Sequence, residues 1–229
     1  MPEMLTDEQL VEKIEELIDA FRSEFVDHLE GVEQTAKTCL LRIYEVWRHV
    51  SLRRTVDLSD AAKQMFQQRR IVPGCSLSRA VFESVGIQYY IRKKLIEYTD
   101  KAEPESIHRL LLSAVFGRKD KSWPERPIQV LTAIDHTDNE FRGFRKEYDR
   151  LCEYAHPNLG GGFGTYARQE GERFEVYFGT NPQGLSMGSW GLGSLHLVLT
   201  IATEINRRLC HFHADFVAMA EKHVPNIPN

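Results

Sequence analysis

The stretch EFRGFRKEYDRLCEYAHPNLGGGFGT, residues 140–165, combines an apolar stripe, a proline and a run of glycines. Its apolar side chains recur at intervals of three and four residues, the spacing of one helix face, at Phe141, Phe144, Tyr148, Leu151 and Ala155. Pro157 disfavours helical backbone at the residue before it, and glycines occupy 160–162. The pattern therefore predicts an amphipathic helix that ends at about Ala155.

The segments before this stretch carry further helical patterns. Thr6 and Gln9 form a capping-box pair at the start of an apolar stripe that reaches Leu29, and a second stripe runs from Ala36 to Val50. Gly31 is expected to bend or end the first helix. The remaining predicted helices cover residues 60–70 with Ser59 as cap, a span from Ser76 or Ser78 to Tyr98, a segment opened by Pro104, and residues 128–134.

After the glycines, the hydrophobic period changes from helical to alternating. Phe174, Val176 and Phe178 alternate with polar neighbours, which predicts a β-hairpin inserted at residues 162–180. Because an isolated hairpin is marginally stable in water, we expect it to lie against the helices. A turn is expected at 181–184, followed by a long C-terminal helix at 190–223 whose apolar stripe spans about 50 Å.

The long N-terminal and C-terminal helices indicate an all-α antiparallel helical bundle. The length allows one large or two small domains, and we favour a single domain covering residues 1–229. The formal net charge of −4 argues against a dedicated non-specific nucleic-acid binder. The four cysteines are far apart in sequence, and the N-terminus has no secretory pattern, so we expect a cytoplasmic protein with reduced thiols and no membrane span. His211 and Asp215 would share a helix face, but two ligands are too few for a metal site, and no cofactor is expected.

The segment Arg150-Leu-Cys-Glu-Tyr-Ala-His156 resembles the arginine, four to six residues, histidine signature of the HEPN superfamily. The upstream segment Ser78–Glu83, SRAVFE, is similar to the long helix of HEPN-like bacterial proteins. Members are small all-α domains that dimerise and place both signature residues in a shared cleft. Many are metal-independent RNases, often toxins of bacterial defence systems, and others are non-catalytic binding modules. The resemblance therefore implies a metal-independent endoribonuclease or an inactive RNA-binding relative.

The resemblance implies specific roles for three residues. Arg150 would stabilise charge on an RNA phosphate, and His156 would act as acid or base in attack by a ribose 2′-hydroxyl, work that suits an imidazole. Asn158 would orient the imidazole or the scissile phosphate. The implied partners are RNA, a second copy of the chain and a cognate protein of a bacterial stress or defence system.

Each role has a competing structural interpretation. Arg150 lies three residues from both Glu147 and Glu153, so it would serve as a surface ion-pair partner. His156 would bond to backbone, Asn158 would shape a turn, and the glycines would form a flexible connector. Leu151 occupies the position after the arginine where active HEPN nucleases carry a polar residue. Leu151 and the acidic net charge favour the alternative function, a non-catalytic dimeric interaction module that binds a protein or small ligand.

Overall fold

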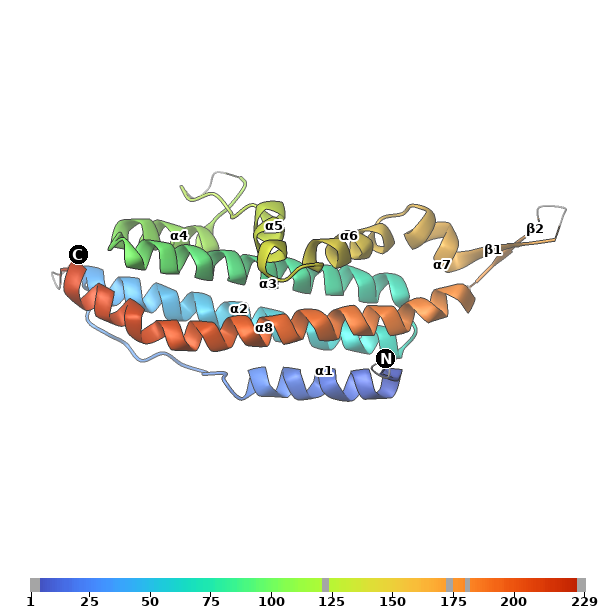
Figure 1. Cartoon of the computed structure of the whole chain (residues 1–229), viewed down its shortest axis with the longest axis horizontal. Coiled ribbons are helices and arrows are strands. Elements are labelled where there is room, and N and C mark those ends of the chain that lie inside the picture. Colours follow the sequence, from blue (N-terminus) through green and yellow to red (C-terminus); the bar gives the residue numbers. More distant parts are fainter. Residues whose placement is uncertain (1–4, 121–123, 172–174, 180–181, 226–229) are drawn as a thin grey trace.

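The computed structural model describes residues 5–120, 124–171, 175–179 and 182–225, with the backbone alone at 182–187. The chain forms an elongated bundle of helices with one small antiparallel hairpin beyond its end (Figure 1). The described elements are α1 (Asp7–Arg22), α2 (Ala36–Gln67), α3 (Ile71–Asp100), α4 (Pro104–Phe116), α5 (Val130–Glu140), α6 (Phe144–Ala155), the π-helix η1 (Leu159–Phe163), α7 (Gly164–Tyr166), β1 (Ala167–Glu170), β2 (Glu175–Phe178) and α8 (Pro182–His223).

Helix α3 lies at the centre of the bundle. It packs against α2 and α8 on one side and against α4, α5 and α6 on the other, while α1 covers α2 and α8 (Figure 1). The buried side chains form one continuous apolar cluster that includes Phe82 of α3 and Phe144 of α6, whose ring centroids are 4.7 Å apart. Burying one such side chain stabilises a fold by roughly 1.5–3 kcal/mol. The prediction of an all-α bundle with a small hairpin is confirmed.

Helix α1 begins as predicted and ends earlier than predicted. The Thr6 hydroxyl accepts from the Gln9 backbone N–H at 3.3 Å, and the Gln9 side chain accepts from the Thr6 N–H at 2.9 Å, which completes the capping box. The helix stops at Arg22, not near Gly31. Residues beyond it form an extended connector held by Arg53, whose guanidinium stacks on the Phe25 ring at 4.4 Å. The apolar stripe therefore continues past the end of the helix.

Helix α2 replaces the two helices predicted between Ala36 and Arg70. Ser59 was expected to cap a separate helix, but it lies inside α2, where its hydroxyl donates to the Thr55 carbonyl at 2.7 Å. Serine bonds in this way to the carbonyl four residues earlier without ending a helix. The prediction of a helix start at Ser59 was wrong because a serine that caps a helix and a serine that bonds to the carbonyl four residues earlier are the same residue type.

Helix α3 starts at Ile71, several residues before the predicted Ser76 or Ser78. Pro73 fits there because it lies within the first turn, where its missing N–H would have no helical partner. Gly74 is buried under the Phe66 ring of α2, and a Cβ atom at this position would lie 2.6 Å from that ring. Pro73 and Gly74, which predicted a break between helices, therefore lie inside α3, where Gly74 allows close contact with α2.

Helices α5 and α6 are separated by a glycine. Gly143, the residue before α6, has a φ of +98°, which favours glycine, so the helix that the stripe predicted from Phe141 begins only at Phe144. The Asp138 carboxylate accepts from the backbone N–H groups of Gly143 and Arg145, at 2.9 and 3.0 Å. Helix α5 begins at Val130, whereas the predicted helix spanned 128–134. The end of α6 at Ala155 is confirmed.

A hairpin forms within the predicted range 162–180, but it begins at Ala167, because η1 and α7 occupy the residues up to Tyr166, and it does not lie against the helices. Its register pairs Ala167 with Phe178, and it projects from the bundle (Figure 1). The Phe178 side chain is 86% exposed. The expectation of a packed hairpin was wrong because, among the described residues, only the short η1 segment and β2 make substantial contact with β1. Position 174 of the predicted alternation lies outside the described residues.

Helix α8 extends the predicted C-terminal helix toward the hairpin. It begins at Pro182, which was expected to form a turn, and it runs for 42 residues, about 60 Å at 1.5 Å per residue. Proline at a first helical position needs no N–H partner, so the predicted turn is the helix start. In the part of the chain that the structure describes, no helix combines the length and apolar content needed to cross a bilayer.

Candidate functional site at the end of helix α6

Arg150 lies on the exposed side of α6. Its guanidinium carbon is 3.9 Å from the centre of the Trp190 ring of α8, a close cation–π contact. Such a contact holds the flat guanidinium parallel to the ring while leaving the N–H groups at its edge directed outward. The tryptophan therefore positions Arg150 without neutralising its charge.

The two carboxylates expected to pair with Arg150 have other partners. Glu147 Oε2 accepts from the Trp190 indole N–H at 2.9 Å and from the Ser194 hydroxyl at 2.7 Å. Glu153 Oε2 accepts from the Asn158 side-chain amide at 2.6 Å. Among the described residues, Arg150 makes no ion pair and instead stacks on Trp190, so the interpretation of Arg150 as a surface ion-pair partner was wrong for this structure.

His156 follows α6 and is exposed. Its φ of −90° and ψ of 148° are extended, as the following proline predicts, and its backbone N–H donates to the Cys152 carbonyl at 3.0 Å. Within the described part of the chain, the imidazole makes no hydrogen bond, so the competing interpretation of a backbone-bonded side chain is not seen. The ring nitrogens are therefore available to a ligand.

Asn158 shapes the turn that follows His156. Its side-chain oxygen accepts from the Gly161 backbone N–H at 3.2 Å, and its amide nitrogen donates to Glu153. Both ends of the amide are thus engaged by the chain, which favours the turn-shaping interpretation over direct contact with a phosphate. The turn continues as η1, where the Thr165 hydroxyl donates to the Gly160 carbonyl at 2.8 Å.

The glycines are packed against the end of α6, where a flexible connector was expected. A Cβ atom on Gly161 would lie 2.2 Å from the His156 carbonyl oxygen and 2.4 Å from that of Tyr154. Both neighbours are backbone atoms, so they cannot move aside as a side chain would. Gly161 is required for the π-helix to cover the last carbonyls of α6, and the turn fixes the backbone that carries His156.

We expect Gly161→Ala to destabilise the protein by about 1–3 kcal/mol, the usual cost of forcing an extra methyl group into a packed site. Gly162→Ala is the matched control, because its nearest neighbour to an added Cβ is 3.8 Å away. Urea denaturation measures the difference in the free energy of unfolding, and hydrogen exchange of the amides in residues 158–162 localises it. Equal stability of the two variants would contradict this role for Gly161.

The inner face of α6 is apolar and anchors the site to α3. Leu151 is fully buried, as its place in the stripe predicted. The Tyr148 hydroxyl donates to the Glu83 carboxylate at 3.2 Å, and burial together with that carboxylate raises the pKa of Tyr148. Burial raises the pKa of the Cys75 thiol to about 12, partly opposed by the nearby positive charge of Arg150. Both groups are therefore protonated near neutral pH.

Arg150 lies in the middle of α6 and His156 directly follows its last residue. Both are exposed, and among the described residues no hydrogen bond joins them. Sequence reasoning missed the contact of Arg150 with Trp190, and it paired Glu147 with Arg150, whereas Glu147 bonds to Trp190 and Ser194. No spacing rule would have found the first contact, because Trp190 lies forty positions along the chain on a different helix. Among the described residues, no three His, Cys, Asp or Glu side chains gather closely enough to hold a metal ion.

The fold and this site define an elongated all-α bundle that presents an exposed arginine and histidine beside a glycine turn. A scan against protein-family models, a search of curated proteins and a search of solved structures each find no match to the chain.

Proposed function

We propose that this protein is a HEPN-like, RNA-directed protein that acts as a metal-independent endoribonuclease through Arg150 and His156. The observation that carries the proposal is the unneutralised guanidinium of Arg150, held on the Trp190 ring while both neighbouring carboxylates bond elsewhere. An exposed, oriented guanidinium is suited to bind phosphate through two parallel hydrogen bonds.

In this mechanism, a ribose 2′-hydroxyl attacks the adjacent phosphorus, the new P–O2′ bond forms and the P–O5′ bond breaks. Arg150 stabilises the negative charge that builds on the non-bridging oxygens. His156 accepts the proton of the 2′-hydroxyl, and the imidazolium formed in this way gives a proton to the departing 5′-oxygen. The products are a 2′,3′-cyclic phosphate and a 5′-hydroxyl, and no step uses a metal ion. Asn158 contributes by fixing the turn behind His156.

The setting that we propose for this activity is the cytoplasm of a bacterial cell, in a stress or defence system where a cognate protein restrains the nuclease. A homodimer is part of this proposal. The formal net charge of −4 implies that RNA binding depends on local groups near α6 rather than on the overall charge of the chain.

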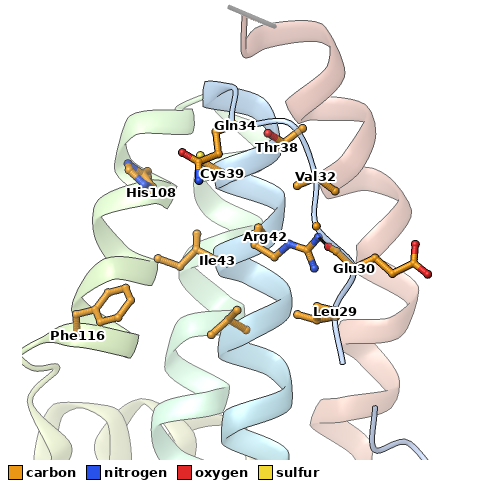
Figure 2. Close-up of a pocket in the computed structure, with 12 residues that line it drawn as sticks. Leu29, Glu30, Val32, Gln34, Thr38, Cys39, Arg42, Ile43, His108 and Phe116 are labelled. Atoms are coloured by element: carbon orange, nitrogen blue, oxygen red, sulfur yellow. Dashed lines mark hydrogen bonds between the residues drawn. The ribbon is translucent and has the colours of Figure 1, made fainter. Parts of the chain in front are cut away.

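A second candidate function is a non-catalytic interaction module, and two observations favour it. Leu151 is fully buried, so it cannot supply the polar group that active HEPN nucleases carry after the arginine. In addition, a surface hollow of about 640 Å³ lies between α2, α4 and the connector that follows α1, far along the bundle from the hairpin. Figure 2 shows Ile43 of α2 and both His108 and Phe116 of α4 around this hollow, a mixed lining suited to a small ligand.

The test is incubation of the purified protein with mixed RNA in excess chelator, followed by analysis of the product ends. We expect cleavage that survives chelation and leaves 2′,3′-cyclic phosphates with 5′-hydroxyl ends. RNA that stays intact, or cleavage that stops when divalent metal is removed, would contradict the nuclease proposal. Intact RNA that still binds the protein would favour the non-catalytic candidate.

A further inference from the structure

The outer edge of β2 carries unused backbone hydrogen-bonding groups. The Gly179 N–H donates to the Tyr166 carbonyl at 2.9 Å, so these two residues form a hydrogen-bonded pair next to the hairpin. Hydrogen-bonded pairs alternate along an antiparallel ladder, which directs the N–H and C=O groups of Val176 and Phe178 away from β1. In the described part of the chain, the sheet has two strands, and no third strand meets this edge.

The same end of the molecule exposes large apolar side chains. Phe178 is 86% exposed, Leu159 is 75% exposed, and Tyr166 is 50% exposed. Leu159 begins η1, Tyr166 ends α7, and Phe178 ends β2, whose hairpin projects from the bundle (Figure 1). An unprotected strand edge beside exposed aromatic groups is a template for pairing with another strand.

We propose that β2 pairs antiparallel with β2 of a second copy of this chain, so that the two hairpins form one four-stranded sheet. Pairing about Val176 makes Val176 of both copies exchange two backbone hydrogen bonds across a two-fold axis. The strand is complementary to itself in this register, because Glu175 lies opposite Tyr177 of the second copy and no two carboxylates face each other. Within one chain, the Tyr177 hydroxyl already donates to Glu175 Oε2 at 3.0 Å, so these groups are suited to bond between copies as well.

The β2 edge is more accessible to a second copy than the β1 edge, because part of β1 is buried within the chain. Ala167, the first residue of β1, is only 4% exposed, so the chain itself covers the beginning of that strand, whereas β2 has no comparably covered residue. Four strands also account for the stability of a hairpin that two strands alone would leave marginal. This interface specifies the contact surface of the homodimer included in the proposed function. It uses neither Arg150 nor His156, so loss of the dimer and loss of RNA cleavage are measured separately.

The deciding experiment compares two proline variants by sedimentation equilibrium over the micromolar range. Val176→Pro removes an N–H that points outward, so the bonds between β1 and β2 are kept while those between copies are lost. Gln169→Pro makes the same change on the outer edge of β1 and is the matched control. We expect the wild type and Gln169→Pro to form dimers. The dimer dissociation constant of Val176→Pro should be at least about tenfold larger than that of the wild type, because two hydrogen bonds between the copies are lost.

A second pair of variants keeps every backbone group. Phe178→Ser is expected to weaken the dimer, whereas Leu131→Ser, at a leucine 54% exposed on α5, leaves it unchanged. Circular dichroism confirms that each variant keeps its helices. A monomeric wild type, equal dimerisation of the two proline variants, or dissociation caused by Gln169→Pro alone would overturn the proposal.

Discussion

Replacing His156 with alanine is expected to lower the rate of metal-independent RNA cleavage by about 10²–10⁴-fold, the usual contribution of a general acid or base. The physical reason is that His156 is exposed and has no hydrogen bond among the described residues, so its ring nitrogens are free to move a proton. For the same reason, the substitution removes no contact that supports the fold. The free energy of unfolding should change by less than about 0.5 kcal/mol.

The matched control for this prediction is His28→Ala. His28 is an exposed histidine in the connector after α1, far from α6 in the fold (Figure 1). Wild type, His28→Ala and His156→Ala are purified identically and compared for cleavage of the same RNA in chelator. If His156→Ala cleaves RNA as fast as His28→Ala, the activity has another source and the catalytic role of His156 is excluded.

Arg150→Ala is expected to slow cleavage by about 10²–10³-fold, which is the typical loss when one donor to a developing oxyanion is removed. Arg150→Lys should recover only part of the rate. Lysine keeps the charge, but it presents a single ammonium in place of a planar pair of donors and stacks less well on Trp190. The measurement is the single-turnover rate with saturating protein, which separates chemistry from binding.

Arg142→Ala serves as the control for nonspecific loss of positive charge. The Arg142 side chain is 78% exposed and lies just before α6, but its only ion pair among the described residues is a long one to Asp138 at 3.9 Å. Its removal should leave the cleavage rate within about threefold of wild type, because an exposed charge of this kind contributes little. Equal losses at Arg142 and Arg150 would indicate that the protein attracts RNA by general charge alone.

The apolar stripes predicted which faces of the helices are buried, and less reliably where the helices begin and end. Phe144, Tyr148 and Leu151 of the stripe predicted for α6 are all buried. The predicted helix boundaries were wrong where one residue type occurs both at helix ends and in another setting. Ser59 has the sequence of a helix cap but bonds back within α2, and Pro182 has the sequence of a turn but begins α8.

The local part of the site followed from the sequence, and the part built by tertiary contact did not. Pro157 and the glycines predicted the end of α6 and the extended backbone at His156. The stacking of Arg150 on Trp190 depends on how α6 lies against α8, which no local pattern encodes. The same limit applies to the hairpin, whose alternation predicted two strands but not that they would project from the bundle.

The account rests on Arg150 and His156 acting on one phosphate, and a double-mutant cycle on RNA cleavage tests this most directly. The rates of wild type, Arg150→Ala, His156→Ala and the double variant are measured under single-turnover conditions in chelator. Because residues that act as a unit give non-additive losses, the double variant should be no more than about threefold slower than the slower single variant. Losses that multiply in the double variant, or a wild type that leaves RNA intact, would contradict the account.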